Sequence, residues 1–292
     1  MPQAVTLCNS NSAKVNSTVI RLQHTIKFMK RFLRSAHSLL VLFGINPLKA
    51  FYSIRGLPAY FRDLQTLRSQ KQAAARQFPF GKPYPCLEDR FLESGTAKGF
   101  YFHQDLLVAR RIHLNNPSIH VDVGSRVDGF VAHVASFCPI VVFDIRHLSI
   151  SIPNIRFIQA DFMAHLNDNL VEYCDSLSCL HALEHFGLGR YGDHVNYDGY
   201  IVGLSNLHKI LKKGGKFYFS VPIGPQRIEF NAHRVFSVIY LLECFADKYH
   251  IDQFSFVDDQ GDLHENVAIG DANAQNNFGC SFGCGIFEMT KL

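Results

Sequence analysis

Two histidines and a glutamate within five residues are the strongest candidates for chemistry in this sequence. In the stretch HALEH, His181, Glu184 and His185 are spaced i, i+3 and i+4, so they share one face if the segment is helical. A histidine acting as general base, or a bound metal ion acting as Lewis acid, makes a hydroxyl group easier to deprotonate. His233, in FNAHRVF, is a further candidate. We predict that these four residues are catalytic and consider them as ligands for Mg, Mn or Zn; a pocket that they merely line is the alternative.

A glycine-containing loop follows the apolar stretch IHVDVG and precedes a helix-like pattern. The dinucleotide loop GxGxxG needs its middle glycine so that the backbone can approach a pyrophosphate, and Arg126 occupies that position here. S-adenosylmethionine has no phosphate, so its loop needs close approach mainly at the first glycine. The sequence therefore favours S-adenosylmethionine over NAD, with Asp122, Gly124, Ser125 and Gly129 as cofactor-binding residues.

Acidic residues close the next two apolar stretches. Asp144 ends PIVVFD, 20 residues after Gly124, where a carboxylate accepts hydrogen bonds from the ribose hydroxyls of either cofactor. Asp161 ends IRFIQAD, where an acid is placed to accept a hydrogen bond from the adenine amino group. For each acid alone, a helix cap or turn residue is the favoured explanation. Together with Asp122 they stand at three successive strand ends, which favours a cofactor site.

The segment GLGRYGD follows HALEH and has the features of an acceptor-binding loop. Its glycine turns would expose charged and aromatic side chains. We predict that the acceptor is bound by Arg190, Tyr191 and Asp193, together with Asn231 and Arg234 from FNAHRVF. An ordinary connecting loop, with Asp193 as the cap of the next helix, is the alternative.

Apolar stretches alternate with helix-like patterns along most of the chain. Strands that are apolar throughout are typical of a parallel sheet covered by helices on both faces. We therefore predict a doubly wound, Rossmann-like α/β fold of seven strands, whose last two strands form an antiparallel hairpin at one edge. The predicted strands are 119–124, 139–144, 155–161, 174–180, 215–222, 251–257 and 284–291, and the predicted helices are about 103–114, from 129, 162–171, 199–212 and 233–246.

These motifs resemble a class I S-adenosylmethionine-dependent methyltransferase over residues 117–222. The resemblance lies in VDVGSRVDG as the glycine loop, VVFDI and IQADF at the two acids, and SLSCLHALEHFG at the fourth strand and its exit. From about Glu93 to the C-terminus, GFYFHQDLLVARRI, HALEHFGLGRYGD, YFSVPIG and FNAHRVF resemble an uncharacterised family of this fold that is often met with bacterial surface-polysaccharide synthesis. Arg126 and Asp128 depart from the usual glycine loop.

Two further resemblances concern HALEH. The pattern HxxEH matches an inverted zinc-protease motif, but that motif needs a long helix in a peptidase fold, and the alternating pattern argues against one. Metal-dependent O-methyltransferases acting on small-RNA ribose ends and on ubiquinone precursors are similar in carrying ExxEH at this place, where His181 would replace the first glutamate. This second resemblance implies methyl transfer to a hydroxyl oxygen.

The N-terminal quarter is strongly basic. Residues 1–75 contain eleven Lys and Arg but one acid, Asp63, which gives +10, whereas the whole chain is +4. We predict a disordered tail over 1–18, a basic helical extension and linker over 19–84, and a methyltransferase-like domain over 85–292; Met29 is an alternative start. Residues 19–45 fit a basic amphipathic helix on an anionic membrane surface, or one packed on the domain with its basic face in water.

The sequence also predicts where the protein resides. No apolar run approaches the roughly 20 residues that span a bilayer, and the eight scattered cysteines are typical of reduced, buried thiols. We therefore predict a cytoplasmic protein, peripheral at the inner face of the membrane through residues 19–75.

The leading functional prediction is an S-adenosylmethionine-dependent O-methyltransferase acting on a sugar hydroxyl of a surface glycan or a lipid-linked precursor. A binding protein that kept this fold without catalysis is one alternative, and an NAD-dependent or nucleotide-sugar enzyme is another. A carbohydrate or glycolipid is the expected partner, and nucleic acid is not.

Overall fold

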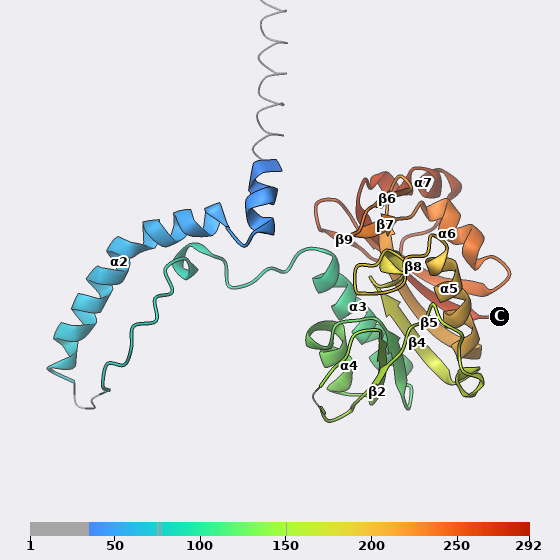
Figure 1. Ribbon diagram of the computed structural model, residues 1–292, viewed down its shortest axis with the longest axis horizontal. Coiled ribbons are helices and arrows are strands. Elements are labelled where there is room, and N and C mark those ends of the chain that lie inside the picture. Colours follow the sequence, from blue (N-terminus) through green and yellow to red (C-terminus); the bar gives the residue numbers. More distant parts are fainter. Residues whose placement is uncertain (1–34, 75, 77, 150) are drawn as a thin grey trace, which may run out of the picture. The chain divides into compact units, whose positions relative to one another are not determined.

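The computed structural model describes residues 35–74, 76, 78–149 and 151–292 (Figure 1). The chain divides into two compact units, residues 1–95 and 96–292. The predicted tail, and the predicted helix 19–45 as far as residue 34, lie outside the described residues, whereas residues 35–42 are helical. Within the described ranges, no helix is both long and apolar enough to cross a membrane.

The N-terminal unit is organised by one long helix, α2 (Pro47–Lys71). It begins at Pro47, because Asn46 caps it by accepting a hydrogen bond from the Lys49 backbone N at 3.0 Å and proline suits the first turn. The chain then returns along this helix. At Gly56 an added β-carbon would lie only 2.0 Å from the carbonyl oxygen of Leu87, so glycine permits this close approach.

The second unit is built on one sheet of eight strands in the order β3-β2-β1-β4-β5-β10-β8-β9. The first five strands of this order are parallel, and β10 runs antiparallel to both β5 and β8. This is the predicted doubly wound, Rossmann-like arrangement. The strands are β1 (His120–Val123), β2 (Ile140–Asp144), β3 (Ile155–Gln159), β4 (Cys174–Leu180), β5 (Leu211–Ile223), β8 (Tyr249–Val257), β9 (Leu263–His264) and β10 (Gly283–Lys291).

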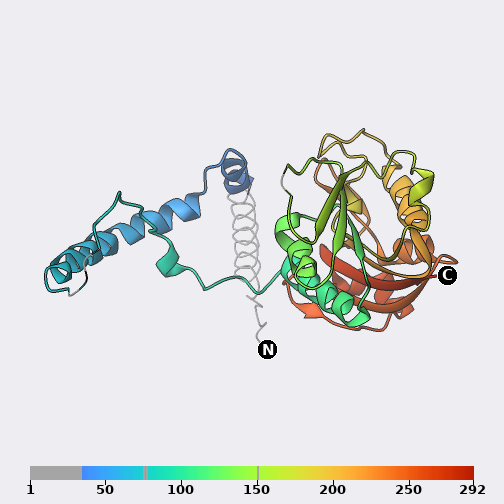
Figure 2. The ribbon, with the colours of Figure 1, turned by 90° about the horizontal axis from the view of Figure 1, so that it is seen from below.

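Helices cover both faces of the sheet (Figures 1 and 2). One apolar core lies between the sheet and α3 and α4, and a second lies between the sheet and α5 and α6. Burial on both faces explains why the central strands are apolar throughout. The helices of this unit are α3 (Phe100–Asn115), α4 (Ala132–Ala135), α5 (Gly199–Ile210), α6 (Val238–Phe245) and α7 (Asp271–Gln275), together with the helical turns η2 (Val127–Val131), η3 (Asp168–Leu170), η4 (Leu183–His185) and η5 (Asn277–Gly279).

The C-terminal strands differ from the prediction in position. β8 and β10 pair antiparallel, as predicted, but they do not form a hairpin added at the edge. β10 is inserted between β5 and β8, and the two-residue β9 closes the edge, so the sheet has eight strands rather than seven. Insertion of the last strand beside β5 is a long-range pairing that no local pattern marks.

Two predicted helices are wrong or misplaced. Residues 162–171 form turns and the single short η3, not a helix. The predicted helix 233–246 begins late, because residues 233–235 form strand β7 (His233–Val235) paired with β6 (Arg227–Glu229). The helix α6 starts only after Ser237, whose hydroxyl accepts a hydrogen bond from the backbone N of Tyr240.

Candidate active site

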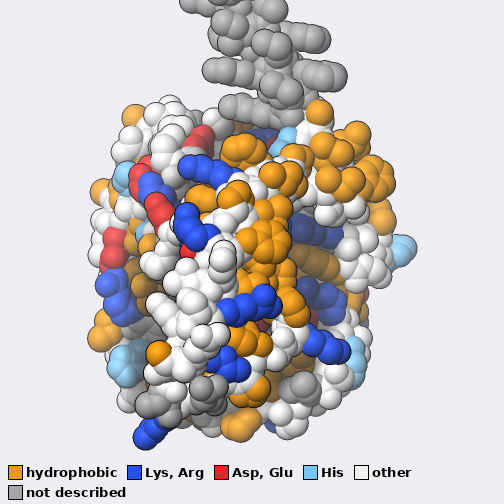
Figure 3. All heavy atoms as spheres, turned by 90° about the vertical axis from the view of Figure 1, so that its left-hand side faces the viewer, with side chains coloured by type: hydrophobic (Ala, Val, Ile, Leu, Met, Phe, Trp, Pro, Cys, Tyr) orange, Lys and Arg blue, Asp and Glu red, His pale blue; other side chains and the backbone are white. Residues whose placement is uncertain are grey.

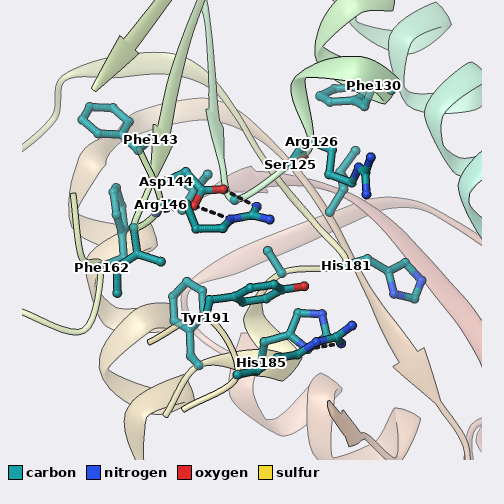
Figure 4. Close-up of a pocket in the computed structure, with 18 of the residues that line it drawn as sticks. Ser125, Arg126, Phe130, Phe143, Asp144, Arg146, Phe162, His181, His185 and Tyr191 are labelled. Carbon is teal, nitrogen blue, oxygen red and sulfur yellow. Dashed lines mark hydrogen bonds and ion pairs between the residues drawn. The ribbon is translucent and has the colours of Figure 1, made fainter. Parts of the chain in front are cut away.

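A cavity of about 450 Å³ opens where β1, β2, β3 and β4 end (Figure 4). The chain leaves β1 toward β2 and β3 and then crosses to β4 on the other side of β1, so the cavity lies at the switch point of the sheet. Many of the predicted site residues line it: Gly124, Ser125, Gly129, Asp144, Asp161, His181, His185, Arg190, Tyr191 and Asp193. The predicted residues that do not line it are Asp122, Glu184, Asn231, His233 and Arg234.

Asp122 holds the glycine loop from beneath. Its side chain is fully buried and accepts hydrogen bonds from the backbone N of Ser125 at 3.0 Å, from the Ser125 hydroxyl at 2.9 Å and from the Ser178 hydroxyl. Burial raises the pKa of Asp122 to about 6, although these hydrogen bonds favour its charged form. Asp122, predicted to bind the cofactor, therefore positions the loop and does not itself line the cavity.

The raised pKa of Asp122 predicts a pH-dependent loss of stability. The folded state binds the Asp122 proton more tightly than the unfolded state, whose aspartate titrates near 3.8, so the free energy of unfolding falls as the pH rises from about 4 to about 6. The expected loss is about 3 kcal/mol. The free energy of unfolding is measured in urea between pH 4 and 7 for the native protein and for an Asp122→Asn variant. The loss due to Asp122 is the change with pH in the difference between the two proteins. Parallel curves would contradict the prediction.

The first glycine of the loop permits close contact between two strand ends. Gly124 has φ +87°, and an added β-carbon would lie 2.6 Å from the β-carbon of Ala182. Arg126, at the middle position of the loop, forms an exposed ion pair with Asp128 in which Nη2 and Oδ2 are 2.6 Å apart. Arg126 and Asp128, the two residues that depart from the usual glycine loop, are thus paired with each other by charge.

Asp144 lies at the end of β2, and its carboxylate forms an ion pair with Arg146. Arg146 donates to its carboxylate from Nε at 2.9 Å, from Nη2 at 2.6 Å and from the backbone N at 2.8 Å. The Arg146 guanidinium also lies over the ring of Tyr191, 4.5 Å from its centroid. Asp144 is buried, whereas the Arg146 side chain is 42% exposed.

Asp161 follows β3 and caps its own turn by accepting a hydrogen bond from the backbone N of Met163 at 2.7 Å. The predicted adenine acid therefore also has the turn role that we weighed as the alternative. Phe143 and Phe162 lie on the same side of the cavity, with their ring centroids 5.4 Å apart (Figure 4). These rings give this side of the cavity an apolar wall suited to a flat heterocycle.

His181 and Glu184 form a buried ion pair, with Nδ1 and Oε1 2.8 Å apart. Burial lowers the pKa of His181, but Cys284 and Glu184 outweigh it and raise that pKa well above 6.5. Burial raises the pKa of Glu184, but the attraction of His181 is the larger effect, so the pKa of Glu184 is lowered. Glu184 does not reach the cavity. Nε2 of His181 and Oε2 of Glu184 are buried without a hydrogen-bond partner within the described chain, so the pair retains unused polar atoms beside the cavity.

His185 has the opposite electrostatic character. Its Nδ1 lies 2.6 Å from the carbonyl oxygen of Ala232, which fixes the proton on Nδ1 and leaves a lone pair on Nε2. Burial lowers its pKa, and the charge of Arg190 adds to this effect despite Glu184. His185 is therefore neutral at pH 7, and its Nε2, which lies 3.7 Å from Oε1 of Glu184, is suited to accept a proton.

The segment FNAHRVF is not a helix over the cavity but a hairpin beside it. His233 pairs with Glu229 at 3.1 Å and does not line the cavity, and Asn231 is exposed near the hairpin tip. Arg234 is buried and donates to the carbonyl oxygens of Phe186 at 2.5 Å and of Tyr197 at 2.9 Å. Arg234 thus fixes both flanks of the acceptor loop, and none of these three residues lines the cavity.

The loop GLGRYGD is organised by Asp193. Its carboxylate accepts hydrogen bonds from the backbone N atoms of Gly187, Gly189 and Tyr191 at 2.9, 3.1 and 3.1 Å. This arrangement holds Tyr191 in the cavity wall, where Figure 4 shows it between Arg146 and His185. Asp193 therefore stabilises the loop, and it is not the cap of the next helix, α5.

Sequence reasoning missed several of the lining residues, and two of them, Arg146 and Tyr101, carry polar groups close to the predicted site residues. Arg146 stands two residues after the strand-end acid Asp144, a spacing that would have suggested an ion pair. Tyr101, from α3, lies with its ring centroid 5.3 Å from that of His181.

The predicted metal set is not assembled. Among the described residues, no three His, Cys, Asp or Glu side chains are placed to hold a metal ion. The Nδ1 atoms of His181 and His185 are engaged by Glu184 and Ala232, and His233 lies outside the cavity. The described cysteines are free thiols, five of them buried, and Cys280 and Cys284 belong to no such cluster.

Part of the sequence matches one family, whose function is unknown. Residues 146–277 match a family described as Caenorhabditis protein of unknown function, DUF268. The match covers 132 of the 292 residues, less than half of the chain. No curated protein matches.

Solved methyltransferases are among the structural neighbours. The N1-methyltransferase for 1,6-didemethyltoxoflavin from Burkholderia thailandensis, solved with S-adenosylhomocysteine, is 15% identical, with a TM-score of 0.44 over 64% of this chain and 78% of that chain. The N-methyltransferase NodS from Bradyrhizobium japonicum WM9, also with S-adenosylhomocysteine, is 11% identical, with a TM-score of 0.42 over 66% and 88%. The [4+2]-cyclase SpnF is 13% identical, with a TM-score of 0.46 over 65% and 80%. At these identities and scores, the chemistry has to be argued from the site itself.

Proposed function

We propose that this protein is an S-adenosylmethionine-dependent methyltransferase that methylates a hydroxyl oxygen of a sugar. The proposal is carried by one observation: Gly124, Asp144 and Asp161, from three neighbouring strand ends, face one cavity together with His181 and His185. When bound, S-adenosylmethionine supplies a methyl group on a positively charged sulfur. The positions of the two acids suit its ribose and adenine.

The residues of the cavity fit this cofactor. Gly124 leaves the backbone open, since a β-carbon there would meet Ala182, and the loop needs no further glycine because no pyrophosphate is bound. Asp144 offers a buried carboxylate for ribose hydroxyls, and Phe143 and Phe162 offer an apolar wall for adenine. Arg126, at the middle glycine position of a dinucleotide loop, disfavours NAD.

His185 is the proposed general base. Nε2 of His185 would accept the hydroxyl proton as the oxygen took the methyl group that the bound cofactor would supply, with the sulfur keeping the electron pair of the broken carbon–sulfur bond. The contact with Ala232 keeps Nε2 unprotonated at the start of this step. Glu184 orients His181, whose charge can stabilise a neighbouring oxygen, so Glu184 is a positioning residue.

Titration calorimetry with S-adenosylmethionine tests the proposal directly. We expect micromolar binding by the native protein and no binding of NAD. Asp144→Ala removes the ribose acceptor, and its affinity should be about 30-fold weaker, since hydrogen bonds to a charged group contribute about 1.5–3 kcal/mol and Arg146 is displaced in exchange. Asp175→Ala, at an exposed position of β4, is the matched control. Absence of heat with the native protein would leave a binding protein of this fold; binding of NAD instead would revive the dinucleotide alternative.

We further propose that the sugar belongs to a surface glycan or a lipid-linked precursor and that the N-terminal unit holds the enzyme at an anionic membrane. Several large apolar side chains of α2 are more than half exposed, and Arg55, Arg62 and Arg68 of the same helix are exposed beside them. Figure 3 shows hydrophobic side chains intermingled with Lys and Arg side chains on the face that it views. Apolar and cationic groups together favour an anionic lipid surface. The exposed apolar residues are Leu48, Phe51, Ile54, Phe61 and Leu67.

Vesicle sedimentation tests the membrane proposal. The full chain should sediment with phosphatidylglycerol vesicles and remain in solution with phosphatidylcholine vesicles, because the attraction depends on lipid charge. Replacing Arg55, Arg62 and Arg68 by Ala should reduce the bound fraction at least fivefold, whereas Arg156→Ala, an exposed change on β3, should leave it unchanged. Equal binding to both kinds of vesicle, or to neither, would refute the proposed attachment.

A further inference from the structure

The Asp144 carboxylate is nearly saturated by one residue. Arg146 donates to Oδ1 twice, from its backbone N and from Nε, and to Oδ2 once, from Nη2. A carboxylate has about four lone-pair sites, so one remains. Two ribose hydroxyls need two sites. Binding of the cofactor ribose at Asp144 therefore requires Arg146 to withdraw at least one of its N–H groups.

The displaced guanidinium would stay at the cavity. Arg146 lies over the ring of Tyr191 and lines the cavity, and the cation–π contact does not depend on Asp144. Figure 4 shows Arg146 next to the Tyr191 ring, with His185 beyond that ring. Binding of the cofactor would thus leave a cation with free N–H donors close to the proposed base.

A second guanidinium lies on the His185 side. Arg190 has its Cζ 5.2 Å from the same Tyr191 centroid and its Nη1 3.3 Å from Nδ1 of His185. It donates to the carbonyl oxygen of Ala232 at 2.9 Å, and within the described residues it has no carboxylate at ion-pair distance. Asp193, in the same loop, is occupied by three backbone N–H groups. Among the described residues, Arg190 is therefore a cavity cation without an anionic partner.

We propose that the acceptor carries an acidic group, a carboxylate or a phosphate, and that Arg146 and Arg190 bind it beside Tyr191, with Arg146 becoming available once the cofactor occupies Asp144. Guanidinium groups suit both anions because they bind them in a bidentate manner. The inference rests on the proposed function and names its substrate class, an acidic sugar or a sugar phosphate. It also orders the reaction, with the cofactor binding before the acceptor.

The first test concerns displacement of Arg146. S-adenosylhomocysteine is titrated into the native protein, Arg146→Ala and the surface control Arg156→Ala. Because the variant lacks the group that competes for Asp144, its dissociation constant should be three- to tenfold lower than that of the native protein, with the control unchanged. An unchanged or weaker affinity of Arg146→Ala would overturn the proposed displacement.

The second test concerns the acidic group. With S-adenosylhomocysteine saturating, D-glucuronate, D-glucose 1-phosphate and D-glucose are titrated into the native protein. One charged sugar should bind at least tenfold more tightly than glucose, and which one does so distinguishes a carboxylate from a phosphate. This preference should fall at least tenfold in Arg146→Ala and Arg190→Ala, persist in Arg156→Ala, and be weaker without S-adenosylhomocysteine.

The outcomes separate the two proposals. If S-adenosylhomocysteine does not bind the native protein, the proposed function fails and the inference fails with it. If it binds but no charged sugar is preferred over glucose, including the case in which none of the three binds, the inference alone is overturned. A preference for charged sugars that survives both arginine substitutions also overturns it.

Discussion

Replacing His185 by Gln should lower the rate of methyl transfer about 100-fold or more while leaving the affinity for S-adenosylmethionine within a factor of two. General bases contribute about 10²–10⁴-fold to rate, and the Gln amide cannot accept the hydroxyl proton. Affinity should persist because the ribose and adenine contacts belong to Asp144 and the strand ends. Single-turnover transfer of a labelled methyl group, measured with the acceptor that the sugar titrations identify, gives the rate.

The pH profile separates a base from a structural histidine. Burial lowers the pKa of His185 below 6.5, so the neutral form, and with it the rate, should persist to a lower pH than for a free imidazole and fall only below that pKa. The His185→Gln variant should lack this fall. His250→Gln, at an exposed position of β8, serves as the control and should keep the native profile. If the rate does not depend on pH between 5 and 7 in either the native protein or the His185→Gln variant, His185 does not take part in the proton transfer.

Replacing Gly124 by Ala should weaken cofactor binding at least tenfold and destabilise the fold by about 3 kcal/mol. The φ of +87° is unfavourable for a residue with a side chain, at about 1–2 kcal/mol. The new β-carbon would also lie 2.6 Å from that of Ala182, and overpacking costs about 1–3 kcal/mol more. Urea unfolding and titration of S-adenosylmethionine measure the two effects.

Two further variants separate the causes. Gly214 also has a positive φ, +75°, but a β-carbon there meets nothing within 4 Å, so Gly214→Ala should show the conformational cost alone and bind cofactor normally. Adding Ala182→Gly to Gly124→Ala removes the overlap and should recover about half of the lost stability. If the double variant is no more stable than Gly124→Ala, the contact with Ala182 is not what requires glycine.

The sequence determined the strands and their ends. Apolar stretches predicted the seven longer strands, and β1 to β4 lie within about two residues of their predicted bounds, because burial on both faces demands continuous apolar residues. Gly124, Asp144 and Asp161 were placed correctly at strand ends, and parallel strands bring such ends to one edge. The position of the cavity followed from local pattern alone.

Helix boundaries were harder to predict. The continuous apolar pattern from His233 to Phe245 resembled one helix, yet its first residues pair with Arg227–Glu229 and the helix starts after Ser237. Ser237 is a common helix cap and was a signal present in the sequence. The insertion of β10 between β5 and β8 had no such signal, since it depends on contacts between distant parts of the chain.

Only the tertiary structure decided which polar groups meet. Sequence spacing put His181, Glu184 and His185 together but could not show that Glu184 is buried, that Ala232 fixes the proton of His185, or that His233 lies outside the cavity. It likewise did not show Arg146 covering Asp144. Local sequence sets where a strand ends, whereas hydrogen bonding and burial of the side chains beyond that end depend on segments that only folding brings into contact.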